Sequence, residues 1–295
     1  VLLLKQGRIY KAGKRNAVFK PKIIEQAYEV DQPAPKLDPQ ALFSAAPGSA
    51  EKIAQMENWR QRVGTHVLIE MRKVAVHHGS RRILDGFNWK VKDGENWMIR
   101  GPSAAGKSTV LALINGDNLQ AYANEIYLFG QKRGAGQSLW DIREKIGYIS
   151  SYLQLRQHQH TDAFEVVCSG FYASNGLYRQ CSAEQFATAR AWSEFLGISD
   201  LADQKFGRLS HGQRQLILLA RAMVKSPVFL ILDEPLQGLD IKNKAKLRLV
   251  FDYIGQHTAT NLIYVPDQQE EKLTCITHVL HMDRGKAVQI NSFGS

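Results

Sequence analysis

The stretch GPSAAGKST at residues 101–109 has the residue types and the spacing of a loop that holds phosphate groups. Gly101 and Gly106 enclose four residues, and Lys107 and Ser108 follow directly. In such a loop the backbone N–H groups and the N-terminus of the next helix form a cradle for an anion. The lysine ammonium reaches the terminal phosphates of a nucleotide, and the serine hydroxyl is a ligand for Mg²⁺. The stretch therefore predicts a site for MgATP, with contacts from Gly101, Pro102, Ser103, Ala104, Ala105, Gly106, Lys107, Ser108 and Thr109.

Two acidic residues follow the apolar run VFLIL at residues 228–232. The run has the length and the continuous apolar character of a strand that is buried in a parallel sheet. The carboxyl end of this strand would present Asp233 to Mg²⁺ and Glu234 to an attacking water molecule. An acidic turn after a core strand is the structural alternative, and the phosphate loop upstream favours the catalytic interpretation. We therefore expect Glu234, together with Lys107, to serve hydrolysis of the nucleotide.

A second pattern for phosphate binding, LSHGQRQ, occupies residues 209–215. Ser210 and Gly212 stand at the start of an expected helix, where backbone N–H groups bind anions. Residues 101–109 already supply the site for this chain's own nucleotide. The second clamp therefore implies a second nucleotide, which a partner would hold.

The elements that must position these residues are visible in the apolar pattern. Strand-like residues occur at 66–78 and around 83–101, and helical spacing begins at residue 107. Helical spacing also covers residues 182–197 and 212–226. The order of strand, loop and helix is the one that a phosphate loop requires. The whole pattern predicts an α/β nucleotide-binding domain.

The first ten residues, VLLLKQGRIY, match residues 279–288, VLHMDRGKAV, in the order of apolar strand, glycine, basic residue and apolar residues. One interpretation is chance similarity between two hairpins of a common type. The other is a tandem repeat, in which residues 1–30 end one copy and residues 66–290 form the next. Residues 31–65 favour the repeat, because their proline, alanine and serine content is typical of a linker between domains. We therefore expect the chain to belong to a longer protein.

The composition of the 295 residues limits the class of protein further. No run approaches the roughly 18 apolar residues that cross a bilayer. The three cysteines have no C-x-x-C spacing, which disfavours a zinc site or a disulfide framework and favours a reducing cytoplasm. The formal net charge of +10 leaves two interpretations open, a solvated or lipid-facing basic surface and a nucleic-acid surface. No DNA- or RNA-reading motif supports the second.

The ordered motifs resemble those of ATP-binding cassette (ABC) ATPases over residues 66–290. The resemblance implies a P-loop NTPase fold of the ABC type, with a mixed sheet core, an antiparallel β subdomain and a helical subdomain. LSHGQ resembles the signature motif, whose nucleotide contacts would be Ser210, Gly212 and Gln213. GLD at 238–240 resembles the D-loop and adds Asp240. Residues 116–151 closely resemble ModF-like ATPases associated with molybdate transport, also called photorepair-type, which carry two cassettes on one chain.

The family arrangement implies that two cassettes pair head to tail around two nucleotides. Ser210 and Gly212 would close over ATP that the other cassette's phosphate loop holds, and Lys107 would hold ATP beneath the other signature. The partner would be a second cassette on the same chain or in a homodimer.

Three positions depart from the family pattern. Ser151 stands where a glutamine usually reaches Mg²⁺, and we treat it as a candidate metal ligand. His78 takes the place of an aromatic residue that stacks on adenine, and a turn histidine is an equal alternative. Asp267 replaces a histidine that contacts the γ-phosphate, which a carboxylate would repel. His278 lies on a later strand, where packing is the favoured interpretation. Because Glu234 is intact, we expect binding of MgATP and slow hydrolysis.

The sequence thus favours a cytoplasmic ATP-binding subunit that couples nucleotide-driven closure to a membrane transport partner. The alternatives are a soluble tandem ATPase that acts on nucleic acid or ribosomes and a non-hydrolysing regulatory module. About 100 residues separate Thr109 from Ser210, which leaves no room for the coiled-coil or zinc insertion of DNA-repair cassettes. Residues 31–65 also lack the long charged helices of ribosome-binding cassettes.

Overall fold

The computed structural model describes residues 2–5, 8–12, 66–150, 153, 157–174, 176–267 and 272–293, and of residues 2–12 it describes only the backbone of two strands. The expected linker at 31–65 and the candidate metal ligand Ser151 lie outside the described residues.

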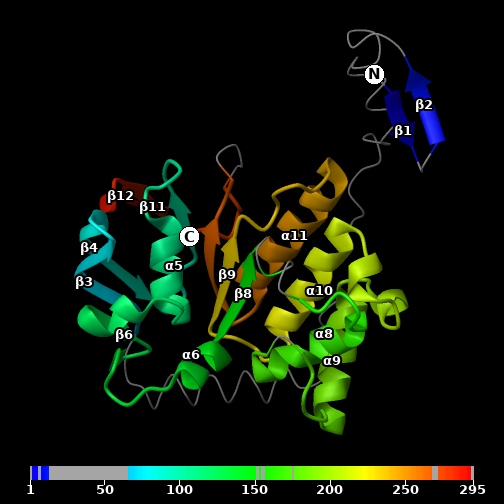
Figure 1. Ribbon diagram of the computed structural model, residues 1–295, viewed down its shortest axis with the longest axis horizontal. Coiled ribbons are helices and arrows are strands. Elements are labelled where there is room, and N and C mark those ends of the chain that lie inside the picture. Colours follow the sequence, from blue (N-terminus) through cyan, green and yellow to red (C-terminus); the bar gives the residue numbers. More distant parts are fainter. Residues whose placement is uncertain are drawn as a thin grey trace.

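A six-stranded sheet forms the centre of the cassette (Figure 1). In spatial order its strands are β12 (Lys286–Ser292), β11 (His278–Asp283), β5 (Trp97–Arg100), β10 (Asn261–Val265), β9 (Phe229–Asp233) and β8 (Ile146–Ser150). All neighbours pair in parallel except β12, which is antiparallel to β11. Parallel strands have their carboxyl ends at one edge of the sheet. The register there pairs Asp233 with Ser150 on one side and with Val265 on the other.

A four-stranded antiparallel sheet packs near α5 on one side of the centre. Its strands, in spatial order, are β4 (Arg81–Lys92), β3 (Val67–His78), β6 (Glu125–Leu128) and β7 (Gln131–Lys132). The short 3₁₀ helix η1 (Leu119–Ala123) leads into β6.

Helices account for the rest of the described cassette. They are α5 (Lys107–Asn115), α6 (Leu139–Lys145), α8 (Ala163–Cys168), α9 (Ala183–Phe195), α10 (His211–Met223) and α11 (Ile241–His257), with 3₁₀ turns η2 (Ser169–Tyr172), η3 (Ser199–Leu201) and η4 (Phe206–Arg208). Figure 1 shows α8, α9 and α10 on the opposite side of β8 and β9 from α5. Both α9 and α10 begin at a serine whose hydroxyl accepts the N–H of a glutamine three residues later, while the glutamine side chain bonds the serine N–H.

The central strands are buried on both faces, and β9 illustrates why. Leu230 and Leu232 belong to the core that α8, α9 and α10 share, while Phe229 and Ile231 belong to the core beneath α5 and the antiparallel sheet. Successive side chains of a strand point to opposite faces, so only a continuous apolar run fills both cores. The predicted buried strand is confirmed. So is the predicted fold class, with its mixed sheet, antiparallel β subdomain and helical subdomain.

The two hairpins that resemble each other in sequence, at residues 2–12 and 278–292, have the same pattern of strand pairing next to the turn. β1 (Leu2–Lys5) pairs with β2 (Arg8–Ala12), and in both hairpins the register shifts between the second and third residue pair from the turn. In the first hairpin the shift separates the pair Leu4–Ile9 from Leu3–Lys11. In the second it separates Met282–Ala287 from His281–Gln289. The match in backbone irregularity supports the interpretation of a repeat.

Candidate nucleotide site

The phosphate loop connects the end of β5 to the start of α5 and is closed by contacts that only glycine allows. A Cβ on Gly101 would overlap the carbonyl oxygen of Met282 on the neighbouring strand β11. Gly106 caps α5 with φ at 99°, in the left-handed region that favours glycine. Ala104 also has a positive φ of 65°, which costs an L-residue roughly 1 kcal/mol. The loop is therefore held in a specific and partly strained shape.

Lys107 and Ser108 are the first two residues of α5, directly after the loop. The Lys107 ammonium donates to the carbonyl oxygens of Gly101 and Pro102, at 2.8 and 3.0 Å. Ser108 is exposed and lies on the first turn of α5, beside Thr109. A lysine held across the loop, with helix N–H groups behind it, is suited to phosphate oxygens.

Asp233 ends β9 at the carboxyl edge of the sheet, half-buried. Its Oδ2 accepts the hydroxyl proton of Tyr148, at an oxygen–oxygen distance of 3.1 Å. Burial raises the pKa of Asp233 above its ordinary value, while the Tyr148 hydrogen bond and the positive charge of Lys107 oppose that rise. Burial, followed by the charge of Asp233, raises the pKa of Tyr148. The tyrosine therefore remains a hydrogen-bond donor at neutral pH.

Glu234 directly follows the last residue of β9. Its φ is 49°, an uncommon conformation for a residue other than glycine, and such residues occur often at functional sites. Its N–H donates to the carbonyl oxygen of Val265, at 2.8 Å. Asp267 lies two residues beyond that carbonyl and is half-buried. Glu234 and Asp267 therefore follow the carboxyl ends of the neighbouring parallel strands β9 and β10, at the same edge of the sheet.

The signature and D-loop residues form a second group. Ser210 caps α10 and Asp240 caps α11, where the Asp240 carboxylate accepts both the N–H and the side-chain amide of Asn243. Gly212 faces Asn243 closely. Gln213 bonds the backbone N–H of Ser210 and is thereby fixed within its own helix. Figure 1 shows α10, which begins after Ser210, and α5, which begins after the phosphate loop, on either side of β8 and β9.

The remaining predicted residues have plainer surroundings. His78 ends β3, is exposed and pairs with Arg81 across the turn to β4. The His278 ring stacks on Trp97 with centroids 4.7 Å apart, and its Nδ1 lies 2.8 Å from Thr277 Oγ1. The packing interpretation of His278 is therefore confirmed. Whether His78 or Asp267 contacts nucleotide stays a prediction.

Sequence reasoning missed two contacts at these sites, those of Tyr148 and Gln215. Gln215 is buried within α10, and its side-chain amide donates to the carbonyl oxygen of Pro235, directly after Glu234, at 2.7 Å. No local signal marked Tyr148, because its partner Asp233 lies 85 residues away on another strand.

The donors around Lys107 suit magnesium. Ser108 offers a hydroxyl and Asp233 a carboxylate, which are the hard oxygen ligands that Mg²⁺ takes beside phosphates. Among the described residues no group of three or more His, Cys, Asp or Glu side chains is placed to hold a metal ion by itself.

The family model for ABC transporters matches residues 84–237, which include the phosphate loop, the signature and the Asp233–Glu234 turn. The chain belongs to the ABC transporter family. The prediction of an ABC-type ATPase is thus confirmed at the level of the family. A relative, the ABC transporter ATP-binding protein ModF of Escherichia coli, is 44% identical over 70% of this chain, and the match spans 42% of the length of ModF. The ModF-like resemblance is confirmed with it.

Other relatives align with the cassette over most of their length. The uncharacterized ABC transporter ATP-binding protein YlmA of Bacillus subtilis is 33% identical, over 75% of this chain and 83% of its own. Among solved structures, an ATP-binding cassette in a dimeric post-hydrolysis state, bound to ADP and Pi, matches with a TM-score of 0.65. That match covers 77% of this chain and all of the other, at 21% identity, and it shows the fold. Among the described residues no helix has the length and apolar character to cross a membrane.

Proposed function

We propose that this cassette binds MgATP at the carboxyl edge of its central sheet, closes head to tail with a second cassette, and couples that closure to a membrane transport partner. One observation carries the proposal. The parallel register of β5, β10 and β9 places Asp233 at the same edge of the sheet at which β5 ends and the loop with Lys107 begins, more than a hundred residues away in the sequence. Glu234 follows at once on the same turn.

The residues divide the chemistry among them. Lys107 and the N–H groups of the loop bind and orient the phosphates, and Ser108 and Asp233 would hold Mg²⁺. Bound Mg²⁺ neutralises charge on the phosphate oxygens. Glu234, directly after Asp233, would accept a proton from the attacking water.

We infer slow hydrolysis from Asp267. A carboxylate at the position where the family has a donor to the γ-phosphate repels negative charge that develops there. Glu234 would still accept the proton of the attacking water, and the repulsion from Asp267 would slow the step. The cassette would hold its nucleotide longer than a pair with the usual histidine.

The proposed partner cassette precedes this one on the same chain. The support is the shared register of the hairpins β1–β2 and β11–β12, including the position of the shift. A preceding cassette would then end with residues 1–30, and residues 31–65 would link it to the cassette at 66–290. ModF is similar in sequence and longer than this chain.

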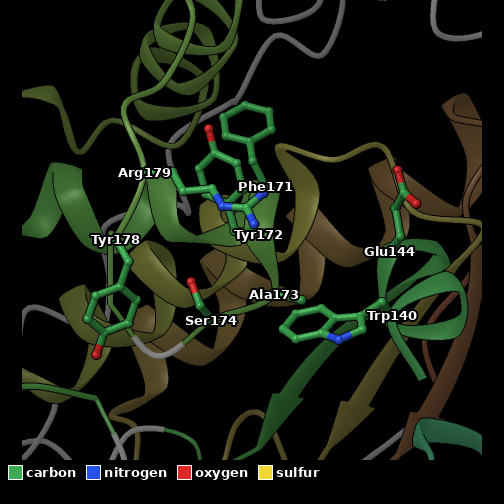
Figure 2. A pocket seen from close by; sticks show the side chains of 8 residues that line it. All are labelled: Trp140, Glu144, Phe171, Tyr172, Ala173, Ser174, Tyr178 and Arg179. Carbon is green, nitrogen blue, oxygen red and sulfur yellow. The ribbon is translucent and has the colours of Figure 1, made fainter. Parts of the chain in front are cut away.

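An exposed aromatic groove supports the transport partner. The groove encloses about 480 Å³ between α6 and the segment after η2. Figure 2 shows Trp140 and Tyr178 on either side of Ala173 and Ser174. Trp140 and Tyr178 are 65% and 76% exposed, and both line this one groove, so the exposed aromatic area is contiguous there. We propose that an apolar helical segment of the transport partner covers them.

The groove adjoins a second, more polar cleft of about 400 Å³, and Ala173 and Ser174 line both. Tyr148 lines the polar cleft and reaches Asp233. Ala173, Ser174 and Tyr148 would thus connect an occupant of the groove to the nucleotide site at Asp233. Such a partner would hold the cassette at the cytoplasmic face of a membrane, with molybdate as the cargo that the ModF-like resemblance implies. A sulfate/thiosulfate import ATP-binding protein of Bradyrhizobium diazoefficiens is a further relative, at 33% identity.

Titration of the protein with a fluorescent ATP analogue tests the nucleotide site. We expect Lys107→Ala to weaken binding at least 100-fold, because a charge-assisted contact and the closed loop are lost together. Lys132→Ala, an exposed lysine on β7, is the matched control and should bind as the wild type does. Equal affinity in the Lys107 variant and the wild type would contradict the site.

A further inference from the structure

The side chain of Tyr148 runs along the sheet toward the nucleotide edge. Tyr148 is the third residue of β8 and pairs with Ile231, two residues before Asp233 on β9. Its hydroxyl nevertheless reaches the carboxylate, 3.1 Å away. Among the described residues this is the one hydrogen bond that the Asp233 carboxylate makes. A single donor therefore decides which oxygen of Asp233 is fixed.

The surroundings of Tyr148 restrict its side chain. Ser150, two residues after Tyr148 on β8, pairs with Asp233 in the register. The Ser150 Oγ accepts the N–H of Leu153, at 3.2 Å, from the segment that follows β8. The ring of Tyr148 packs against the core beneath α5. The hydroxyl thus has little freedom to leave Asp233.

The hydrogen bond from Tyr148 makes the two oxygens of the Asp233 carboxylate different. Oδ2 accepts from Tyr148, so rotation of the carboxylate about its bond is restricted and Oδ1 keeps one direction. The positive charge of Lys107, at the end of the phosphate loop, lowers the pKa of the same carboxyl group and so favours its ionised form. A metal ligand fixed by a neighbouring hydrogen bond binds more tightly, because its orientation is set before the ion arrives.

We propose that Tyr148 is a positioning residue for the metal site, and that its hydroxyl fixes the Asp233 carboxylate in the orientation that receives Mg²⁺ together with nucleotide. The inference rests on the proposed function, since it concerns the same site. It gives β8, through Tyr148, a role at the metal site. This matters in a chain that has Ser151 at the position where the family has a glutamine that reaches Mg²⁺.

The test separates metal from nucleotide. Mg²⁺ is titrated into the full chain with a fluorescent ATP analogue present, and analogue binding is measured separately with excess chelator. Tyr148→Phe should raise the Mg²⁺ concentration for half-maximal binding about tenfold, the usual effect of losing one orienting partner of a metal ligand. Its affinity for the analogue in chelator should equal that of the wild type, because the phosphate loop is untouched.

Tyr127→Phe is the matched control. Tyr127 lies on β6, is half-buried and loses the same atom with no Asp233 contact, so its metal requirement should not change. A Tyr148→Phe protein with the wild-type Mg²⁺ requirement overturns the inference. A wild type that binds no analogue at all overturns the proposed function instead.

Discussion

Gly212 of the signature helix lies directly against Asn243 at the start of α11. A Cβ at position 212 would come within 2.8 Å of the Asn243 side chain, which itself bonds the Asp240 carboxylate. The first turns of α10 and α11 are therefore in contact, and the signature and the D-loop share a support. A shift of one N-terminus would move the other.

This contact predicts a coupled pair of substitutions. Gly212→Ala should destabilise the fold by about 1 kcal/mol, because Asn243 must move and its bond to Asp240 is strained. In an Asn243→Ala background the same change should cost much less, since the obstructing side chain is gone. Chemical denaturation of the four proteins of the cycle measures the interaction energy. Additive effects would show that Asn243 does not limit the approach of the helix.

Burial of Lys225 predicts a dependence of stability on pH. Desolvation, with the nearby charges of Arg221 and Arg143, lowers the pKa of Lys225 to about 7, and Glu144 opposes the shift. The unfolded chain has the ordinary pKa near 10.4. Below pH 7 both states carry the charge, and the native state bears the full cost of burying it. Between pH 7 and 10 the native lysine is neutral while the unfolded one is charged, so the wild type gains at most about 1.4 kcal/mol per pH unit.

Lys225→Met removes that cost at every pH. Its free energy of unfolding, relative to the wild type, should be highest at pH 6 and should fall as the pH rises from 7 to 10. Urea denaturation at pH 6, 8 and 10 gives the comparison. A difference that stays constant with pH would mean that the native lysine keeps its ordinary pKa.

Asp267 predicts a gain of activity. If its carboxylate faces the γ-phosphate, Asp267→His removes a repulsion and adds a donor, and turnover should rise roughly ten- to a thousand-fold. Adding Glu234→Gln should abolish the gain, because the water loses its base. Steady-state hydrolysis is measured at concentrations where the cassettes associate. An Asp267→His protein that associates normally and is no faster would place the limit elsewhere.

The sequence predicted the elements whose signal is local. The phosphate loop has its chemistry within nine consecutive residues, and β9 has an apolar run because both of its faces are buried. The contact of Tyr148 with Asp233 depends on the register between strands 85 residues apart, which no local pattern encodes. The approach of Gly212 to Asn243 depends in the same way on how two helices pack. The aromatic groove arises where α6 meets the segment after η2, and its residues are separate in the sequence.

The central claim is that ATP drives this cassette to close head to tail over nucleotide. Sedimentation velocity of the Glu234→Gln protein, with and without MgATP, tests it most directly, because hydrolysis is blocked while binding continues. We expect a monomer without nucleotide and a dimer with it, and we expect Ser210→Arg to remain monomeric since the arginine would occupy the closing surface. Ser182→Arg is the matched control, because Ser182 caps α9 with the same pair of bonds and should leave the dimer intact. A dimer of equal strength in the Ser210→Arg protein, or no dimer with MgATP in any variant, would contradict the account.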